Sequence, residues 1–224
     1  MFNTKSDYAY TTLRQRILAG QYEPGAVLNQ ASLAKEIGIS TTPLREALRR
    51  LMSEGLVELD AHRDARTTPL TAEEARDLLE VRRSLDPLAV SLAAERRTRA
   101  DLALMRELLE RVHPLGPDPG YTDLIAHRDF HAALYRASHN DVLISTLDSL
   151  WDKADRYRRE GLQDARSQVE RDEKDAEHHV LVDHIASGDG EAAAAVMLRH
   201  IDTSLGAKAA HRLSGAGARR PANV

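Results

Sequence analysis

One stretch of the chain, residues 28–57, restricts the possible folds more than any other part. It predicts two short amphipathic helices joined by a tight turn at Gly38, with the second helix stopping at Gly55. The second helix repeats apolar residues at the spacing of one buried face: Leu44, Ala47, Leu48 and Leu51. This pattern is typical of a helix-turn-helix, whose second helix enters the major groove of DNA.

The outward face of this second helix carries hydroxyl groups and arginines. Its members are Ser40, Thr41, Thr42, Arg45 and Arg49. Ser40 or Thr41 is expected to cap the helix, and Pro43 suits its first turn. Because such side chains bind base edges and phosphates, we predict that they contact DNA. The alternative is a plain helical hairpin, which gives no reason for hydroxyls and arginines in place of mixed glutamate and lysine.

Residues 56–68 predict a β-hairpin wing beside this helix. A short alternating strand over 56–59 leads into a polar turn over 60–64 and a second strand over 65–68. Arg63 and Arg66 lie near the tip of the predicted wing and are further expected DNA contacts. The sequence therefore predicts a winged helix-turn-helix DNA-binding domain over residues 1–70.

Length and charge indicate a second domain. The chain has 224 residues, whereas a winged helix needs about 60–70. Residues 1–70 hold nine Lys and Arg against eight Asp and Glu, and the rest holds 22 against 27. With so little net positive charge, DNA affinity is expected to depend on dimerisation. There is no cysteine, no signal peptide and no apolar run near the ~18 residues of a membrane helix, so we expect a soluble, cytoplasmic protein without membrane contact.

The remainder predicts an antiparallel bundle of six or seven helices over residues 71–212. Helical patterns cover 71–97, 101–112, 121–138, 142–160, 168–187 and 191–209, and no strand alternation follows residue 70. Thr71 and Glu74 form a capping-box pattern, and apolar residues then recur from Leu78 to Leu92 at alternating spacings of three and four. Residues 213–224 are small, polar and basic, and are expected to form a disordered tail. The predicted fold class is mainly α, a winged helix-turn-helix followed by an all-α bundle.

Four of the ten histidines are predicted to meet in the core of this bundle. His127 and His131 are four residues apart on the apolar face of one helix, and His178 and His200 lie on the apolar faces of two later helices. Neutral imidazoles suit zinc, our first expectation, or nickel, cobalt or manganese. For any one of them alone, a core histidine hydrogen-bonded to a neighbour is the alternative.

Residues 8–70 resemble the DNA-binding domain of the GntR family of bacterial transcription regulators. The family's core motif appears here as Leu28, Leu33-Ala34, the run from Gly38 to Leu48, Leu51, and the run from Gly55 to Val57. The resemblance implies that double-stranded operator DNA is a partner. Thr41 stands where the family usually has arginine, and Asp64 where it usually has a wing-tip glycine. Both departures bear on operator sequence and affinity.

Residues 72–210 resemble the FCD domain, the ligand-binding module of the FadR-type branch of that family. The matching motifs lie at 80–86, 130–140 and 177–200. The resemblance implies a metal held by one aspartate and three histidines. His131, His178 and His200 match those histidines, and His127 takes the place of the aspartate.

Arg82 lies in the first of these motifs, one helical turn after Leu78, and can point into the bundle. A buried arginine near a bound metal would hold a carboxylate effector bidentately. An internal ion pair with Asp86 is the alternative reading of this residue.

Together these patterns predict a homodimeric transcription regulator, a repressor rather than an enzyme, controlled by a small organic acid at the metal. One alternative is a metal-dependent enzyme with a DNA-binding head. Against it, His-Arg-Asp-Phe-His at 127–131 lacks the glutamate of the His-Glu-x-x-His zinc proteases, and no spare acid or base lies beside the histidine pair. A second alternative is a direct metal sensor without an organic ligand.

Overall fold

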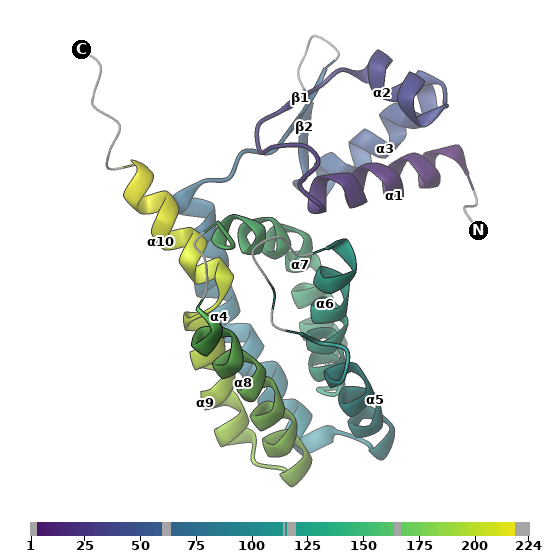
Figure 1. The fold of residues 1–224 in the computed structure, drawn as a ribbon. Helices are drawn as coiled ribbons and strands as arrows, with labels where there is room; N and C mark the ends of the chain where they lie inside the picture. The colour runs from purple at the N-terminus through teal and green to yellow at the C-terminus, as the bar shows by residue number, and fades with distance from the viewer. Residues whose placement is uncertain (1–3, 60–63, 114, 116–119, 164–166, 218–224) are drawn as a thin grey trace. The chain divides into compact units, whose positions relative to one another are not determined.

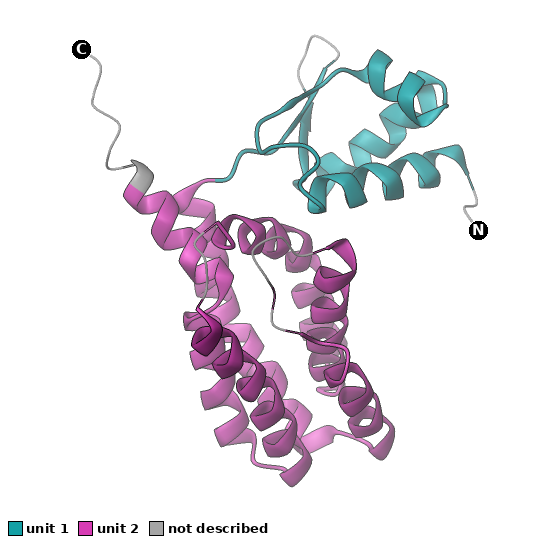
Figure 2. Ribbon diagram, in the orientation of Figure 1, with its two compact units in different colours: residues 1–70 teal, residues 71–224 magenta. Residues whose placement is uncertain are grey.

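A computed structural model describes residues 4–59, 64–113, 115, 120–163 and 167–217. The chain divides into two compact units, residues 1–70 and residues 71–224 (Figure 2). Within the described ranges, no helix has both the length and the apolar character needed to cross a membrane.

The first unit combines three helices with a small antiparallel sheet (Figure 1). The helices are α1 (Lys5–Leu18), α2 (Gln30–Ile37) and α3 (Thr41–Ser53), and the strands are β1 (Val27–Leu28), β2 (Val57–Leu59) and β3 (Ala65–Thr67). The strand order is β1-β3-β2, and Arg66 at the centre of β3 lies opposite both Val27 and Glu58. Strand β1 was not predicted, because two residues are too few to show an alternation of apolar and polar residues.

The predicted buried face of α3 is confirmed. Its four apolar residues are at most 1% exposed, and this face packs against α1. Gly38 ends α2 in the left-handed conformation with φ 77°, which residues with a Cβ rarely adopt. Ser40 is the N-cap of α3, but its side chain makes no capping hydrogen bond. The expected side-chain cap at Ser40 or Thr41 is therefore absent, and both hydroxyls remain exposed.

The second unit contains seven helices within its described residues (Figure 1). They are α4 (Ala72–Arg96), α5 (Arg99–Leu109), α6 (Tyr121–Arg136), α7 (Asp141–Gly161), α8 (Gln168–Ser187), α9 (Gly190–Asp202) and α10 (Leu205–Gly217). The long helix α4 packs against α6, α7, α8, α9 and α10. It is therefore the element around which this bundle is organised.

Two predicted features of the bundle differ in detail. Thr71 caps α4 by accepting a 3.1 Å hydrogen bond from the Glu74 amide, but the Glu74 carboxylate binds Lys153 and Tyr157 instead of closing a capping box. The helix expected over 191–209 is interrupted after Asp202, and Ser204 accepts a hydrogen bond from the Ala207 amide as a new helix begins. That helix runs to Gly217, so residues 213–217 are helical and not part of a tail, while residues 218–224 lie outside the described residues.

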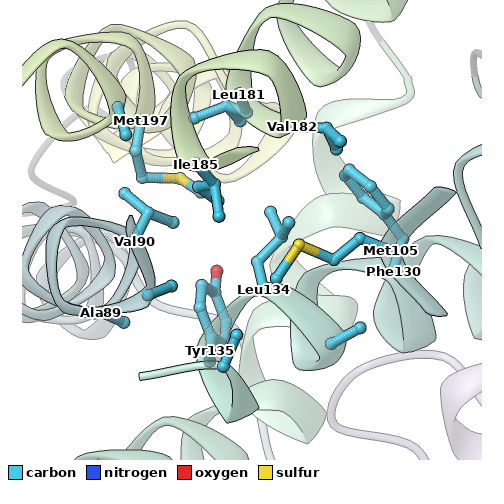
Figure 3. Packing of buried hydrophobic residues seen from close by; sticks show 14 of the residues in the cluster. Ala89, Val90, Met105, Phe130, Leu134, Tyr135, Leu181, Val182, Ile185 and Met197 are labelled. Atoms are coloured by element: carbon cyan, nitrogen blue, oxygen red, sulfur yellow. The ribbon is translucent and has the colours of Figure 1, made fainter. Parts of the chain in front are cut away.

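The core of the second unit joins α4 and α6 to α8 and α9. Figure 3 shows side chains from all four helices meeting: Ala89, Val90, Phe130, Leu134, Tyr135, Ile185 and Met197. Each of these residues is at most 1% exposed. The Tyr135 hydroxyl is a polar group inside this apolar set, and burial obliges it to find a hydrogen-bond partner.

The last turn of α7 depends on glycine. A Cβ on Gly161 would overlap the backbone carbonyl of Leu205, the first residue of α10. We predict that Gly161→Ala lowers the free energy of unfolding by about 1–3 kcal/mol, because overpacking against backbone cannot relax cheaply. Gly215→Ala is the control, since it lies in exposed helix with no atom within 4 Å of the added Cβ. It should stabilise by about 0.5–1 kcal/mol. Thermal or denaturant unfolding measures both, and equal effects would contradict the prediction.

Candidate metal centre and nucleic-acid interface

The outward face of α3 carries the five predicted DNA-contacting residues of that helix and its cap. Ser40, Thr41, Thr42, Arg45 and Arg49 are all exposed. Ser40, Thr41 and Thr42 lie at the helix N-terminus, where unpaired backbone amides and the helix dipole favour phosphate, and Arg45 and Arg49 follow about one and two turns later. The Arg45 Nε donates a 3.2 Å hydrogen bond to Gln30 Oε1, which orients the guanidinium toward α2 while leaving it exposed.

Of the two predicted wing arginines, only Arg66 can be placed. Arg63 lies outside the described residues. Arg66 lies within β3, and its guanidinium donates to the Gly25 carbonyl. Asp64 accepts a 3.2 Å hydrogen bond from the side chain of Asn29, the N-cap of α2. The wing-tip carboxylate is therefore partly engaged within the protein.

The structure brings the four predicted histidines together. His127 and His131 come from α6, His178 from α8 and His200 from α9, and one nitrogen from each lies within 4.8 Å of the others. Ring centroids are 4.4 Å apart for His127 and His131, and 4.9 Å apart for His178 and His200. Three of the rings are at most 5% exposed, and His127 is half-buried.

Burial keeps these imidazoles neutral. Desolvation is the largest influence on each ring and lowers the pKa of His127, His131 and His178 well below the ordinary value of 6.5. The pKa of His200 is also lowered, although its hydrogen bond to Glu177 acts in the opposite direction. Neutral imidazole is the form that binds a metal.

Hydrogen bonds fix the orientation of two rings. The Tyr135 hydroxyl donates to Asp86 Oδ2 at 2.8 Å, so its oxygen is left to accept from His131 Nδ1 at 3.3 Å. His200 Nδ1 donates a 2.8 Å hydrogen bond to Glu177 Oε2. Both contacts place a proton on Nδ1 and leave Nε2 with a free lone pair. These tautomers are assigned from the hydrogen-bond network.

Several nitrogens of the cluster have no hydrogen-bond partner in the described part of the chain. They are His127 Nδ1, His131 Nε2, and both Nδ1 and Nε2 of His178. Buried polar atoms are normally paired, so four unpaired nitrogens in one cluster require an explanation. A divalent ion of the zinc type fits this donor set, because it takes tetrahedral nitrogen ligands.

The histidines line a cavity of about 40 Å³, and its wall also carries Arg82, Arg158 and Lys174. Arg82 donates to Asp86 at 2.6 Å, and Arg158 donates to Asp155 at 2.6 Å. Burial lowers the pKa of Arg158 to about 10, even though Asp155 opposes the shift. The predicted ion pair of Arg82 is therefore present, and the guanidinium still reaches the cavity wall.

The residues that support the cluster were not predicted from the sequence. Glu177 binds His200 and Lys174, and these hydrogen bonds lower its pKa to about 2 against the opposing effect of burial. Tyr135 and Arg158 were also missed. The spacing of four between His131 and Tyr135 was a usable signal, whereas Arg158 gave none, because arginines near a helix end usually face water.

Comparison with known proteins accounts for both units. The FCD domain family matches residues 77–203, and the bacterial regulatory proteins of the gntR family match residues 5–63. The regulator YdhC of Bacillus subtilis (strain 168) is 32% identical over 148 residues, which are 64% of this chain and 65% of that protein. The transcriptional repressor GlaR of Escherichia coli (strain K12) is 26% identical over 202 residues, 88% of this chain and 92% of GlaR. The chain thus spans less than two thirds of YdhC but most of GlaR.

The fold also matches a solved structure. The structure of E. coli McbR/YncC superposes with a TM-score of 0.75 at 24% identity, covering 90% of this chain and 95% of that one. The family matches and the fold agree with the residues built up above, a helix-turn-helix with its wing and a helical bundle around a histidine cluster. The chain belongs to the gntR family of bacterial regulatory proteins, and its second unit is an FCD domain.

Proposed function

We propose that this protein is a transcription repressor that binds operator DNA as a homodimer and releases it in response to a small carboxylic acid. The observation that carries the ligand-dependent part is the set of unpaired, buried imidazole nitrogens beside two arginines. The observation that carries the DNA-binding part is the exposed face of α3. Repression is favoured because GlaR, a repressor, matches over most of both chains.

For DNA recognition, α3 enters the major groove with its N-terminus leading. Arg45 and Arg49 then face base edges and phosphates. Ser40, Thr41 and Thr42 have shorter side chains and donate hydrogen bonds near the start of the helix. Arg66 supports the wing through the Gly25 carbonyl. One recognition helix on a nearly neutral unit makes few phosphate contacts, so two copies are needed for a stable complex.

For ligand recognition, His127, His131, His178 and His200 would hold a divalent ion, zinc first and nickel, cobalt or manganese as further candidates. When bound, such an ion would supply a Lewis acid for an effector carboxylate, either by expanding its coordination to five or in place of one histidine. Arg82 and Arg158 flank the cavity, and their guanidinium groups offer the same anion the N–H donors that are not used by Asp86 and Asp155. The cavity of about 40 Å³ limits the effector to a small acid unless the wall moves.

A signal can leave the cavity along α7. Arg158 lines the cavity, and its neighbour Tyr157 accepts a 3.1 Å hydrogen bond from the Thr71 amide at the start of the second unit. The Tyr157 hydroxyl also donates to Glu74 at 2.8 Å. A shift of Arg158 toward a bound anion would therefore change how α7 holds the residue that follows the DNA-binding unit. The effector must bind the two resulting arrangements with different affinity.

The first test concerns the function itself. Duplexes enriched by the protein from a random library are titrated with metal-free protein, metal-loaded protein, and metal-loaded protein with a panel of short carboxylic acids. We expect operator affinity to fall at least about 10-fold only when metal and one acid are both present, a coupling of about 1.4 kcal/mol. A response to metal alone would identify a direct metal sensor. Turnover of an acid without any effect on DNA would identify an enzyme, and absence of an enriched duplex would refute the DNA-binding role.

The second test concerns Arg45. Arg45→Ala should weaken specific operator binding by more than about 30-fold, because one base contact is worth about 1–3 kcal/mol and a dimer loses it twice. Arg50→Ala is the matched control, since it removes the same charge from the same helix where Arg50 covers the Tyr10 ring instead. Gel shifts compare the two, with circular dichroism to verify folding. Equal losses in both variants would show that only net charge matters.

The third test concerns His127, which stands where the family's metal site has aspartate. Without that carboxylate the bound ion keeps its full charge, so the wild type should prefer zinc, nickel or cobalt over manganese. His127→Asp should shift the preference toward manganese and weaken the binding of an anionic effector. Asp129→Asn, an exposed change two residues away, should do neither. Metal competition by calorimetry and elemental analysis decides, and an unchanged preference in His127→Asp would remove His127 from the ligand set.

A further inference from the structure

Helix α4 carries an apolar stripe that lies beside its buried face. The stripe consists of Leu78, Val81, Leu85, Leu88 and Leu92, separated alternately by three and four residues. The buried face consists of other residues: Ala75, Asp86, Ala89, Val90, Ala93 and Ala94. Val81 is 42% exposed and Leu88 is 46% exposed, while Leu78, Leu85 and Leu92 are half-buried. Leu85 and Leu92 also pack partly against the core of their own bundle. The bundle of one chain therefore leaves this stripe partly uncovered.

The stripe continues into a groove between α4 and α7. Leu78 and Val81 line it from α4, and Leu150 lines it from α7. The groove has a volume of about 440 Å³, and its rim includes Glu73 and Asp77. An apolar floor with a charged rim is the usual composition of a protein–protein contact. Alternating spacings of three and four are the pattern by which one helix packs along another.

The arrangement of the stripe is close to symmetric about Leu85. Leu78 and Leu92 lie seven residues to either side, and Val81 and Leu88 lie four and three residues away. A surface that pairs with its own copy across a two-fold axis needs this kind of self-complementarity. An antiparallel pairing centred on Leu85 would set Leu78 against Leu92 of the second copy and Val81 against Leu88.

The charges at the two ends select this orientation. Residues 73–80 carry four acidic residues and one arginine, whereas residues 95–99 carry three arginines and one glutamate. Antiparallel helices bring the acidic end of one copy to the basic end of the other, and parallel helices bring like charges together. The same distribution of charge is also favourable for the helix dipole. Burial of the apolar stripe would supply the free energy of association, and the charges would favour the antiparallel orientation.

We propose that the α4 stripe, Leu78 to Leu92, is the dimer interface, pairing antiparallel with the same stripe of a second copy of this chain. This inference rests on the proposed homodimer and assigns its surface. It places the central helix of each bundle at the two-fold axis, with Leu150 of α7 at the edge of the contact.

Sedimentation of the full chain tests the surface. The double variant Val81→Glu and Leu88→Glu should change a dimer into a species of 24.9 kDa at micromolar concentration, because four carboxylates would face one another. Leu104→Glu on α5 is the control, since Leu104 is also 42% exposed but lies outside the stripe. A double variant that remains dimeric overturns the surface while leaving the proposed function intact. A wild type that is monomeric without DNA overturns the surface and the proposed homodimer together.

Cysteine cross-linking tests the orientation, and the natural chain has no cysteine to interfere. In the antiparallel arrangement residues 81 and 88 of opposite copies are offset by only about 1.5 Å along the helices, whereas the two copies of residue 81 are offset by about 12 Å at 1.5 Å per residue. A disulfide spans Cα atoms only about 4.4–6.8 Å apart. Oxidation should therefore join Val81→Cys to Leu88→Cys in a mixture and leave each variant alone unlinked. Linking of each variant to itself would establish a parallel pairing and overturn the proposal.

Discussion

The second unit places four neutral imidazoles at its centre and leaves several of their nitrogens unpaired. An unpaired buried polar group costs about 1–3 kcal/mol, so a cluster with four such atoms is expensive for a bundle of this size. The surrounding apolar core of α4, α6, α8 and α9 provides the stability that allows this arrangement. A metal ion that bound one nitrogen of each ring would recover part of this cost, which would tie the site to the stability of the unit.

The basic side chains around the cluster are each paired with a carboxylate of the protein. Arg82 is paired with Asp86, Arg158 with Asp155, and Lys174 with Glu177. If the four histidines hold a divalent cation, they add no negative charge, and the cavity would carry an excess of positive charge. That excess, rather than a free arginine, is what would attract an anionic effector into a low-dielectric pocket. An aspartate at position 127 would have removed part of it.

Periodicity is the reason that much of this arrangement could be read from the sequence. The buried face of α3 and the inward placement of the four histidines follow from spacings of three and four within single helices, which constrain direction strongly. Residues that pair across separate helices show no periodic spacing in the sequence. The hydrogen bond between Tyr135 and Asp86 was therefore not predicted. The break between α9 and α10 was also not predicted, because alanine-rich segments at 192–195 and 207–210 lie on both sides of it and only the Ser204 cap marks the new start.

Helix α4 serves three purposes because its faces point in different directions. Its N-cap, Thr71, is the first residue of the second unit, and its inner face supplies Arg82 and Asp86 beneath the histidine cluster. Its outer stripe includes Val81, next to Arg82 in sequence but exposed. If two such stripes pair, a rotation of α4 caused by an anion at Arg82 must also move the dimer contact one residue away. A rigid helix would therefore allow the effector to act on Thr71, where the second unit begins, and on the dimer contact through a single motion.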